Sequence, residues 1–597
     1  MNHKSFVSVV VRLFDWMLMV RKTSLLVAGA GFCLAAVLRA APSAPVADAA
    51  QLGDRDAVKA LLKQAADVNA AQGDGMTALH WAAVKNDAEL VQTLLYAGAN
   101  VRALTRIGNY TPLILAAQHG NAKAMEPLVA AGADVNAKTA NGTTVLMLAA
   151  HSGSVDAVKL LLDKNVDVNA RESVRGLNAA MFAAASNRAG VIELLARRGA
   201  DLKATSTVVD LNGLDRQKFG ELLFGNPQPP PPPGGRGNEG SQQQAQQGGR
   251  NFPGGRGLQG KAGIERQYQL NELIFAQGGL GPIHMAARQG YREAVASLID
   301  AGVDVNELTA SDRSSPLLIA TLNGHFDLAK TLLDRGADPN LASENGATPL
   351  YAVLNCEWAP KSLYPQPRAH LNQKVSYLDL MTALLDKGAN PNARLRKKVW
   401  YSGYSFDLSG VDEIGATPFW RAAYASDVAA MRLLAAHGAD PNIPTSKGAG
   451  RPRTADIDRE VTDVSKVPPV PVGGPGIPPL VAAAGSGYGE GFAANSHRFA
   501  PTGMMAAVKY LVEELHADVN AKDHEGNTAL HNAAARGDVE MIKYLVSKGA
   551  DVTAVNREGK TTADMANGPV QRIQPWPEAL ALLESLGAKN NHKCVSC

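Results

Sequence analysis

The amino-acid sequence repeats a single pattern about every 33 residues along most of its length. The opening threonines Thr77, Thr111 and Thr144 lie 34 and 33 residues apart, and the step from Thr528 to Thr561 is again 33. These threonines belong to similar segments, of which the clearest are TALHWAA at 77–83, TPLILAA at 111–117 and TTVLMLAA at 143–150. A fixed period of this size indicates a chain built from stacked copies of one small unit.

Each copy has the pattern of two short helices followed by a turn. In residues 75–100 the first apolar set contains small residues, and the second has the i, i+1, i+4, i+5 spacing of a helix buried along one stripe. The two sets are Leu79, Trp81, Ala82 and Ala83, then Leu90, Val91, Leu94 and Leu95. Gly98 falls where a left-handed residue ends the second helix. One unit leaves an apolar face uncovered, so we expect neighbouring units to stack on it.

The T-P-L-H-x-A-A core resembles the ankyrin repeat, and so does the segment ADVNA at 66–70, 133–137 and 517–521. This resemblance covers most of residues 47–588. It implies an all-α solenoid of roughly 11 to 12 helix-turn-helix units with turn or hairpin tips and disordered insertions. Further units open near Asn178, Gly281, Ser315, Thr348, Thr417, Pro478, Thr528 and Thr561.

Insertions divide the predicted solenoid into blocks. Residues 204–277 contain a five-proline run and a Gln/Gly-rich stretch, which cannot bury enough apolar surface to become ordered. Asn178 and Gly281 are 103 residues apart, about three periods, so we expect one degenerate unit split by this linker. The predicted layout is repeats at 45–203, the split unit at 204–277, repeats at 278–442 with insertions at 355–376 and 394–413, a Pro/Gly-rich insertion at 443–477, repeats at 478–588 with an insertion at 485–503, and a tail at 589–597.

Residues 1–44 have the pattern of a targeting segment. Arg21 and Lys22 precede an uncharged apolar run at 23–38, and small residues with proline follow at 40–44. This order predicts a secretory signal peptide, with an N-terminal membrane anchor as the alternative, and Met19 as a second candidate start. We therefore expect an exported protein of bacterial type, periplasmic or secreted, with anchoring in the inner membrane left open.

Composition fits a binding protein made of helices. The 597 residues are 46% hydrophobic but only 5% aromatic, as expected for helices that pack through alanine and leucine. There are 59 Lys and Arg against 56 Asp and Glu, a net charge of +3. This balance argues against a nucleic-acid partner, which usually requires a basic stripe.

The resemblance places partner contacts on the turns before each core. Carried over by position, it implies a protein partner contacted by Arg106, Asn109, Tyr110, Thr139, Asn141, Arg171, Arg175, Arg313 and Glu344. The segment RLRKKVWYSGYSF at 394–406 adds Arg396, Lys397, Trp400 and Tyr401, since arginine and aromatic side chains are common interface anchors. The alternative is an extended hairpin whose aromatic side chains pack on the adjacent unit.

The sequence offers no convincing catalytic or metal-binding set. GKTT at 559–562 imitates a phosphate-binding loop, but Ala554 stands where that motif needs glycine. His80, His284 and His531 occupy the fourth position of the core, where the resemblance implies that the imidazole ties the turn to the helix. We expect no enzyme and no resident cofactor.

The chain ends in Cys594-Val595-Ser596-Cys597. In an oxidising compartment this pair predicts a disulfide. A c-type haem attachment site needs a histidine next, so haem is expected only if the sequence is truncated. A metal site is the third alternative. Taken together, the sequence predicts a non-enzymatic interaction scaffold of the cell envelope, with a redox protein carrying haem at its C-terminus as the alternative.

Overall fold

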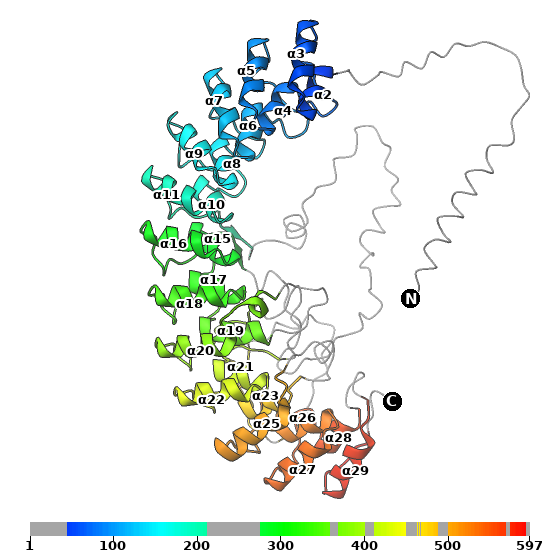
Figure 1. Ribbon diagram of the computed structural model, residues 1–597. Coiled ribbons are helices and arrows are strands. Elements are labelled where there is room, and N and C mark those ends of the chain that lie inside the picture. Colours follow the sequence, from blue (N-terminus) through cyan, green and yellow to red (C-terminus); the bar gives the residue numbers. More distant parts are fainter. Residues whose placement is uncertain are drawn as a thin grey trace, which may run out of the picture.

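The computed structural model describes residues 44–211, 275–358, 368–399, 411–448, 463, 465, 467–487, 499–568 and 574–592. They form a curved stack of helix pairs that runs from α2 to α29 (Figure 1). Twelve pairs lie in the described residues, and the strand content is one two-stranded ribbon. The predicted all-α solenoid of about 11 to 12 units is confirmed.

The first helices of the pairs line the inner side of the arch (Figure 1). They are α2 (Pro45–Leu52), α4 (Ala78–Val84), α6 (Pro112–Gln118), α8 (Val145–Ser152), α10 (Ala179–Ala184), α15 (Pro282–Gln289), α17 (Pro316–Leu322), α19 (Pro349–Glu357), α21 (Pro418–Tyr424), α23 (Pro479–Ala483), α26 (Ala529–Ala535) and α28 (Thr562–Ala566).

The second helices form the outer row (Figure 1). They are α3 (Arg55–Lys63), α5 (Ala88–Tyr96), α7 (Ala122–Ala130), α9 (Val155–Leu162), α11 (Ala189–Arg197), α16 (Arg292–Asp300), α18 (Phe326–Asp334), α20 (Tyr377–Asp386), α22 (Val428–Ala436), α25 (Gly503–Lys509) with its π-helical continuation η3 (Tyr510–Glu514), α27 (Val539–Ser547) and α29 (Pro577–Ser585).

The repeated residues determine where the helices begin. The Thr111 side chain accepts a hydrogen bond from the backbone N–H of Ile114 at 3.2 Å, and Pro112 occupies the first helical position. The second helix of the preceding pair begins in the same way, because Asp87 accepts from the backbone N–H of Leu90 at 3.0 Å. These caps satisfy backbone donors that short helices would otherwise leave unpaired.

One hydrophobic core runs through the stack. Leu79 and Ala82 of α4 and Leu94 of α5 are fully buried members of this core, and α4 contacts the first helices α2 and α6 on either side. The core continues from Val46 to Ala588. Each unit therefore covers the apolar face of the next, which is why no single unit needs a core of its own.

The core histidines have the structural role that the sequence predicted. In α4, His80 Nδ1 accepts a hydrogen bond from the backbone N–H of Thr77 at 3.1 Å, and Nε2 lies 3.0 Å from the carbonyl oxygen of Tyr110 in the next turn. His284 repeats the arrangement with the N–H of Gly281 and the carbonyl of Glu307. Burial lowers the pKa of His284 and of His531 to about 4, so both imidazoles are neutral at physiological pH.

The stack corrects the prediction of a split unit at 204–277. Helix α10 packs directly on α15, and α11 packs on α16. The side chain of Asn187, before α11, accepts a hydrogen bond from the backbone N–H of Ala294 at 3.1 Å. No unit lies between these pairs, because their apolar faces already cover each other.

A short ribbon closes the base of this insertion. Strand β1 (Val209–Asp210) pairs antiparallel with β2 (Ala276–Gln277), with Val209 opposite Gln277. The chain therefore leaves the stack at the end of one turn and returns to the same place. The prediction was wrong because the inserted length is close to a multiple of the repeat period. In the sequence, such a length cannot be told from a unit whose motif has been lost.

In the described part of the chain, no helix is long and apolar enough to cross a membrane. The predicted signal peptide or anchor spans residues 1–44, of which only Ala44 is among the described residues.

Candidate partner-binding surface

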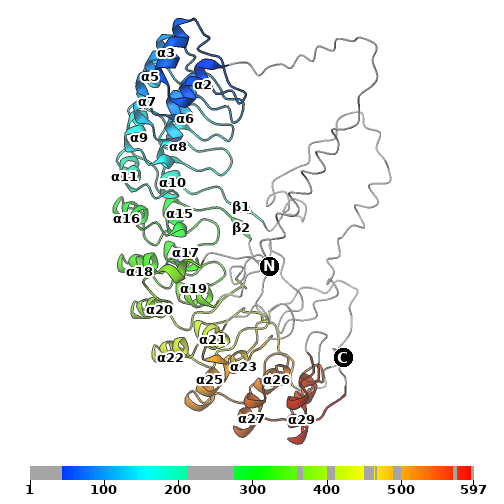
Figure 2. The ribbon, with the colours of Figure 1, turned by 45° about the vertical axis from the view of Figure 1, so that its right-hand side comes forward.

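The turns between successive pairs, here called the tips, extend in a row from the inner helices (Figure 2). Most neighbouring tips are joined by one backbone hydrogen bond of 2.6 to 3.1 Å. The N–H of Arg106, for example, donates to the carbonyl of Asp74 at 2.8 Å. The equivalent bonds join Ser173 to Asn141, Thr207 to Arg175, Ala310 to Gly279, Glu344 to Asp312, Arg396 to Asn345, Ser446 to Ile414 and Arg557 to Glu525. The tips therefore form a connected platform.

Left-handed backbone shapes the ends of the tips. In the second tip, Gly108 has φ +82° and Asn109 has φ +52°. Glycine adopts such angles without strain, and asparagine tolerates them better than most residues. This reversal leaves the Asn109 side chain exposed at the tip, on the surface where the sequence placed it.

Several predicted contact residues brace the tips. Arg106 is exposed, but its guanidinium donates to the carbonyl of Gly73 in the preceding tip at 3.0 Å. Arg171 donates from Nε to the carbonyl of Gly176 at 2.7 Å and from its terminal nitrogen to the carbonyl of Thr205. Its guanidinium thus spans two tips.

Thr139, Asn141 and Tyr110 are also engaged within the tips. The Asn141 side chain accepts from the hydroxyls of Thr139 and Thr143. Tyr110 is partly buried, and its carbonyl meets His80. The sequence located these residues on the tips; the Asn141 bonds are local to one tip, whereas the contact between Tyr110 and His80 joins two units.

Three predicted arginines project from the platform. Arg175, Arg313 and Arg396 are exposed, and their guanidinium groups make no hydrogen bond or ion pair with another described residue. Lys397 follows Arg396 in the chain and pairs with Glu344 at 3.8 Å, with its ammonium group 4.9 Å from the ring centre of Phe275. These side chains give the middle of the platform a positive edge.

Apolar side chains at the tips are the part that sequence reasoning missed. Ile107 is 76% exposed, Val174 65% and Val208 41%. Folding does not require an apolar side chain at an exposed turn, so such residues are candidates for contact with another protein. The sequence signal that could have identified these residues is a hydrophobic side chain at a tip position where the other tips carry polar residues.

The first helices add a second row of apolar side chains. The residue after the fourth core position is Trp81 in α4, Leu148 in α8, Phe182 in α10 and Met285 in α15, and each is partly exposed. Trp81 Nε1 donates to the Gln72 side chain of the preceding tip at 2.8 Å, which places this row beside the tips. Together they form an apolar inner face bordered by a polar platform.

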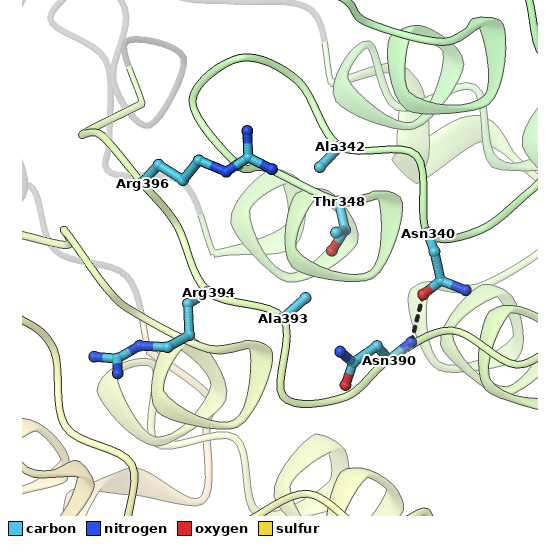
Figure 3. A pocket seen from close by; sticks show the side chains of 8 residues that line it. Asn340, Ala342, Thr348, Asn390, Ala393, Arg394 and Arg396 are labelled. Carbon is cyan, nitrogen blue, oxygen red and sulfur yellow. Dashed lines mark hydrogen bonds between the residues drawn. The ribbon is translucent and has the colours of Figure 1, made fainter.

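A hollow of about 340 Å³ separates two tips near the middle of the stack. It is lined by Asn340, Ala342, Gly346, Thr348, Asn390, Ala393, Arg394 and Arg396. The Asn390 N–H donates to Asn340 Oδ1 at 2.7 Å across its wall. Figure 3 shows the Arg394 side chain directed away from Asn340, whereas the Arg396 guanidinium lies beside Ala342.

The two arginines of this hollow differ in chemistry. Arg394 donates to the carbonyls of Gly415 and Pro444, each at 2.9 Å, so these N–H groups are used in hydrogen bonds within the fold. Arg396 has its guanidinium available to a carboxylate or carbonyl group in the hollow, which is the geometry that arginine uses to bind carboxylates.

The basic segment after α20 is divided between fold and surface. Leu395 and Val399 are buried with Trp420 of α21 in a second hydrophobic cluster beside the first helices. Lys398 is buried between them and donates from Nζ to the carbonyl of Val411 at 2.7 Å. Arg396 and Lys397 face solvent. The described part of the segment therefore packs on α21 and still presents two cations, whereas the aromatic side chains of the hairpin alternative lie outside the described residues.

Four predicted site residues lie outside the described residues, namely Trp400, Tyr401, Cys594 and Cys597. Among the described residues, no group of three His, Cys, Asp or Glu side chains is placed to hold a metal ion.

Comparison with known proteins agrees with the helix pairs. Models of the family described as Ankyrin repeats match residues 46–139, 113–206, 283–375 and 496–546. Alpha-latrocrustotoxin-Lt1a of Latrodectus tredecimguttatus is 26% identical over 288 residues, which is 47% of this chain and 15% of that protein. Neurogenic locus notch homolog protein 2 of Homo sapiens is 40% identical over 249 residues, 42% of this chain and 7% of that protein.

A third relative, Palmitoyltransferase Hip14 of Drosophila melanogaster, is 35% identical over 101 residues, 17% of this chain and 16% of that protein. The chain thus spans about a sixth or less of the length of these three relatives. All three come from animals, so they do not support the predicted bacterial type.

Proposed function

This chain belongs to the ankyrin-repeat family, and on that basis we propose that it is a non-enzymatic scaffold that binds a protein partner on its tip platform and inner face. The observation that carries the proposal is the combination of exposed Ile107 and Val174 with the projecting guanidinium groups of Arg175 and Arg396. Apolar anchors beside unpaired cations are typical of interfaces and serve no packing role here.

The proposed partner presents an apolar segment flanked by carboxylates. The positive edge formed by Arg175, Arg313 and Arg396 complements acidic groups, and such complementarity supports specificity and fast association. The hollow beside Arg396 accommodates one carboxylate side chain. A protein partner fits this surface better than a small ligand, because the tips form an extended row and small ligands favour enclosed pockets.

We further propose that the scaffold acts outside the cytoplasm, at the cell envelope. This part rests on the sequence at 21–44, where charged, apolar and small residues follow one another as in a signal peptide. The near balance of 59 Lys and Arg against 56 Asp and Glu supports a protein partner over a nucleic acid. Ankyrin repeats are generally interaction modules, which supports the non-enzymatic assignment, although Hip14 shows that a chain carrying them can be named as an enzyme.

The proposal is tested by capture of the tagged full-length protein from its own cells after mild cross-linking, with a double variant V174D/R396E in parallel. We expect a stoichiometric protein partner with the wild type and its loss with the double variant, because the variant removes an apolar anchor and reverses a charge. The matched control is Tyr96→Ser, which changes an exposed residue of α5 away from the tips. Equal capture by the wild type and the double variant would exclude the tip platform as the binding surface.

A further inference from the structure

Part of the Pro/Gly-rich insertion at 443–477 is held on the tips of the last units. Arg557, in the last tip, donates to Asp463 Oδ2 at 2.5 Å and to the carbonyl oxygens of Val467 and Pro468 at 2.9 and 2.6 Å. Lys447 donates from Nζ to the carbonyl of Val470 at 2.9 Å. Two cations from different tips therefore hold one stretch of chain through its carbonyl oxygens and one carboxylate.

Prolines give the held stretch its shape. Its sequence at 467–471 is VPPVP, so Val467, Pro468 and Val470 each precede a proline, which restricts their backbone to extended conformations. Proline also lacks a backbone N–H, so such a stretch offers mainly carbonyl acceptors to its surroundings. An extended proline-rich segment loses little conformational freedom when it binds.

Arg396 occupies the same position on its tip as Arg557. The backbone N–H of Arg396 donates to the carbonyl of Asn345 at 2.8 Å, and that of Arg557 donates to the carbonyl of Glu525 at 2.9 Å. Both side chains therefore leave the platform from equivalent points of the row of tips. A nearby carboxylate is neutralised in each case, because Lys397 pairs with Glu344 at 3.8 Å and Lys560 pairs with Glu558 at 2.6 Å.

The hollow beside Arg396 offers donors to a ligand. The Arg396 guanidinium is exposed and makes no hydrogen bond with another described residue. Asn390 Oδ1 accepts from the backbone N–H of Asn392 at 2.9 Å, whereas the Asn390 NH₂ group donates to no described residue. On the opposite wall, Asn340 Oδ1 is occupied by the Asn390 backbone N–H. The hollow thus suits a ligand rich in acceptors, such as carbonyl and carboxylate oxygens.

We propose that the Arg396 hollow binds an extended, proline-containing segment of the partner protein through its carbonyl oxygens and a nearby carboxylate, as Arg557 holds Asp463, Val467 and Pro468. This inference rests on the proposed function and specifies the kind of segment that the platform accepts. The chain's own insertion supplies the pattern, which is a carboxylate four residues before a Val-Pro-Pro sequence.

The test measures binding of a labelled synthetic peptide with the sequence of residues 462–474 to the full-length protein by fluorescence anisotropy. The Arg557 site is already filled by the attached copy at high effective concentration, so the added peptide reports on Arg396. We expect saturable binding to the wild type and at least tenfold weaker binding to Arg396→Glu. The control Arg292→Glu makes the same charge change at an exposed residue of α16 and should bind as the wild type does.

Two altered peptides test the chemistry of the ligand. Changing Asp463→Asn, or Pro468 and Pro469 together to Ala, should each weaken binding severalfold. Absence of binding to the wild type, or equal affinity for the wild type and Arg396→Glu, would overturn the inference. If the capture experiment nevertheless returned a partner that is lost with V174D/R396E, the proposed function would stand and only the proline-containing ligand would be excluded.

Discussion

At the scale of single residues, the histidine of the repeated core links one unit to the next. His80 and His284 each join the start of their own helix to the following turn through both ring nitrogens. Burial keeps these rings neutral, and the cost of charging them appears as a lowered pKa. His370, outside the repeated core, instead lies beside the Cys356 thiol and the Glu357 carboxylate.

The neutral histidines predict a loss of stability in acid. His531 has a pKa lowered from 6.5 to about 4 in the folded protein, so the unfolded chain binds more protons between these values. The free energy of unfolding should therefore fall as pH drops from about 6.5 towards 4, by on the order of 2 kcal/mol for one such histidine. Urea unfolding at pH 7 and at pH 4.5 measures this difference in the free energy of unfolding. Between these two pH values, His531→Gln should lose less stability than the wild type. The control His119→Gln, at an exposed helix end, should keep the wild-type loss.

At the scale of elements, the segment around 395–399 shows how an insertion can become part of the fold. Val399 is fully buried with Trp420 and Val411, and Lys398 donates to the Val411 carbonyl. This second cluster holds the backbone that presents Arg396 and Lys397 to solvent. The presentation of the two cations therefore depends on packing against α21.

Val399→Asp should release this segment while leaving the stack folded. An unpaired carboxylate in the second cluster should destabilise it locally by about 3 kcal/mol or more. Hydrogen exchange read by mass spectrometry should then rise at 395–399 and 411–416 and stay unchanged in α4 and α5. Val174→Asp places the same charge on an exposed tip and should leave exchange at 395–399 unaltered. Global unfolding by Val399→Asp would show that the second cluster supports the whole stack.

At the scale of the whole molecule, the stack is continuous across its long insertions. Helix α10 meets α15, and β1 pairs with β2 where the chain leaves and returns. Residues 212–274 should therefore be replaceable by a short Gly/Ser linker, because closing a shorter loop costs less entropy and no unit of the stack is removed. Circular dichroism and thermal melting should match the wild type. A clear drop in melting temperature would instead mean that this segment contributes to the fold. Replacing an equal length that includes α6 and α7 serves as the destabilising control.

The sequence by itself determined the repeat, the helix starts and the position of the tips. Thr111 with Pro112, Asp87 and Gly98 act within a few residues of their own backbone, and the 33-residue period makes them recognisable. The same locality explains the role of His80, whose partners keep a fixed place in the repeat.

Only the tertiary structure decided which tip residues brace the platform and which remain available. Arg171 reaches the carbonyl of Thr205, Arg394 reaches that of Pro444, and His370 meets Cys356 across an insertion. It also decided that α10 stacks directly on α15, against the expectation of a split unit. These outcomes depend on which segments come together in space, and an insertion of irregular length removes the fixed spacing from which the sequence could have predicted them.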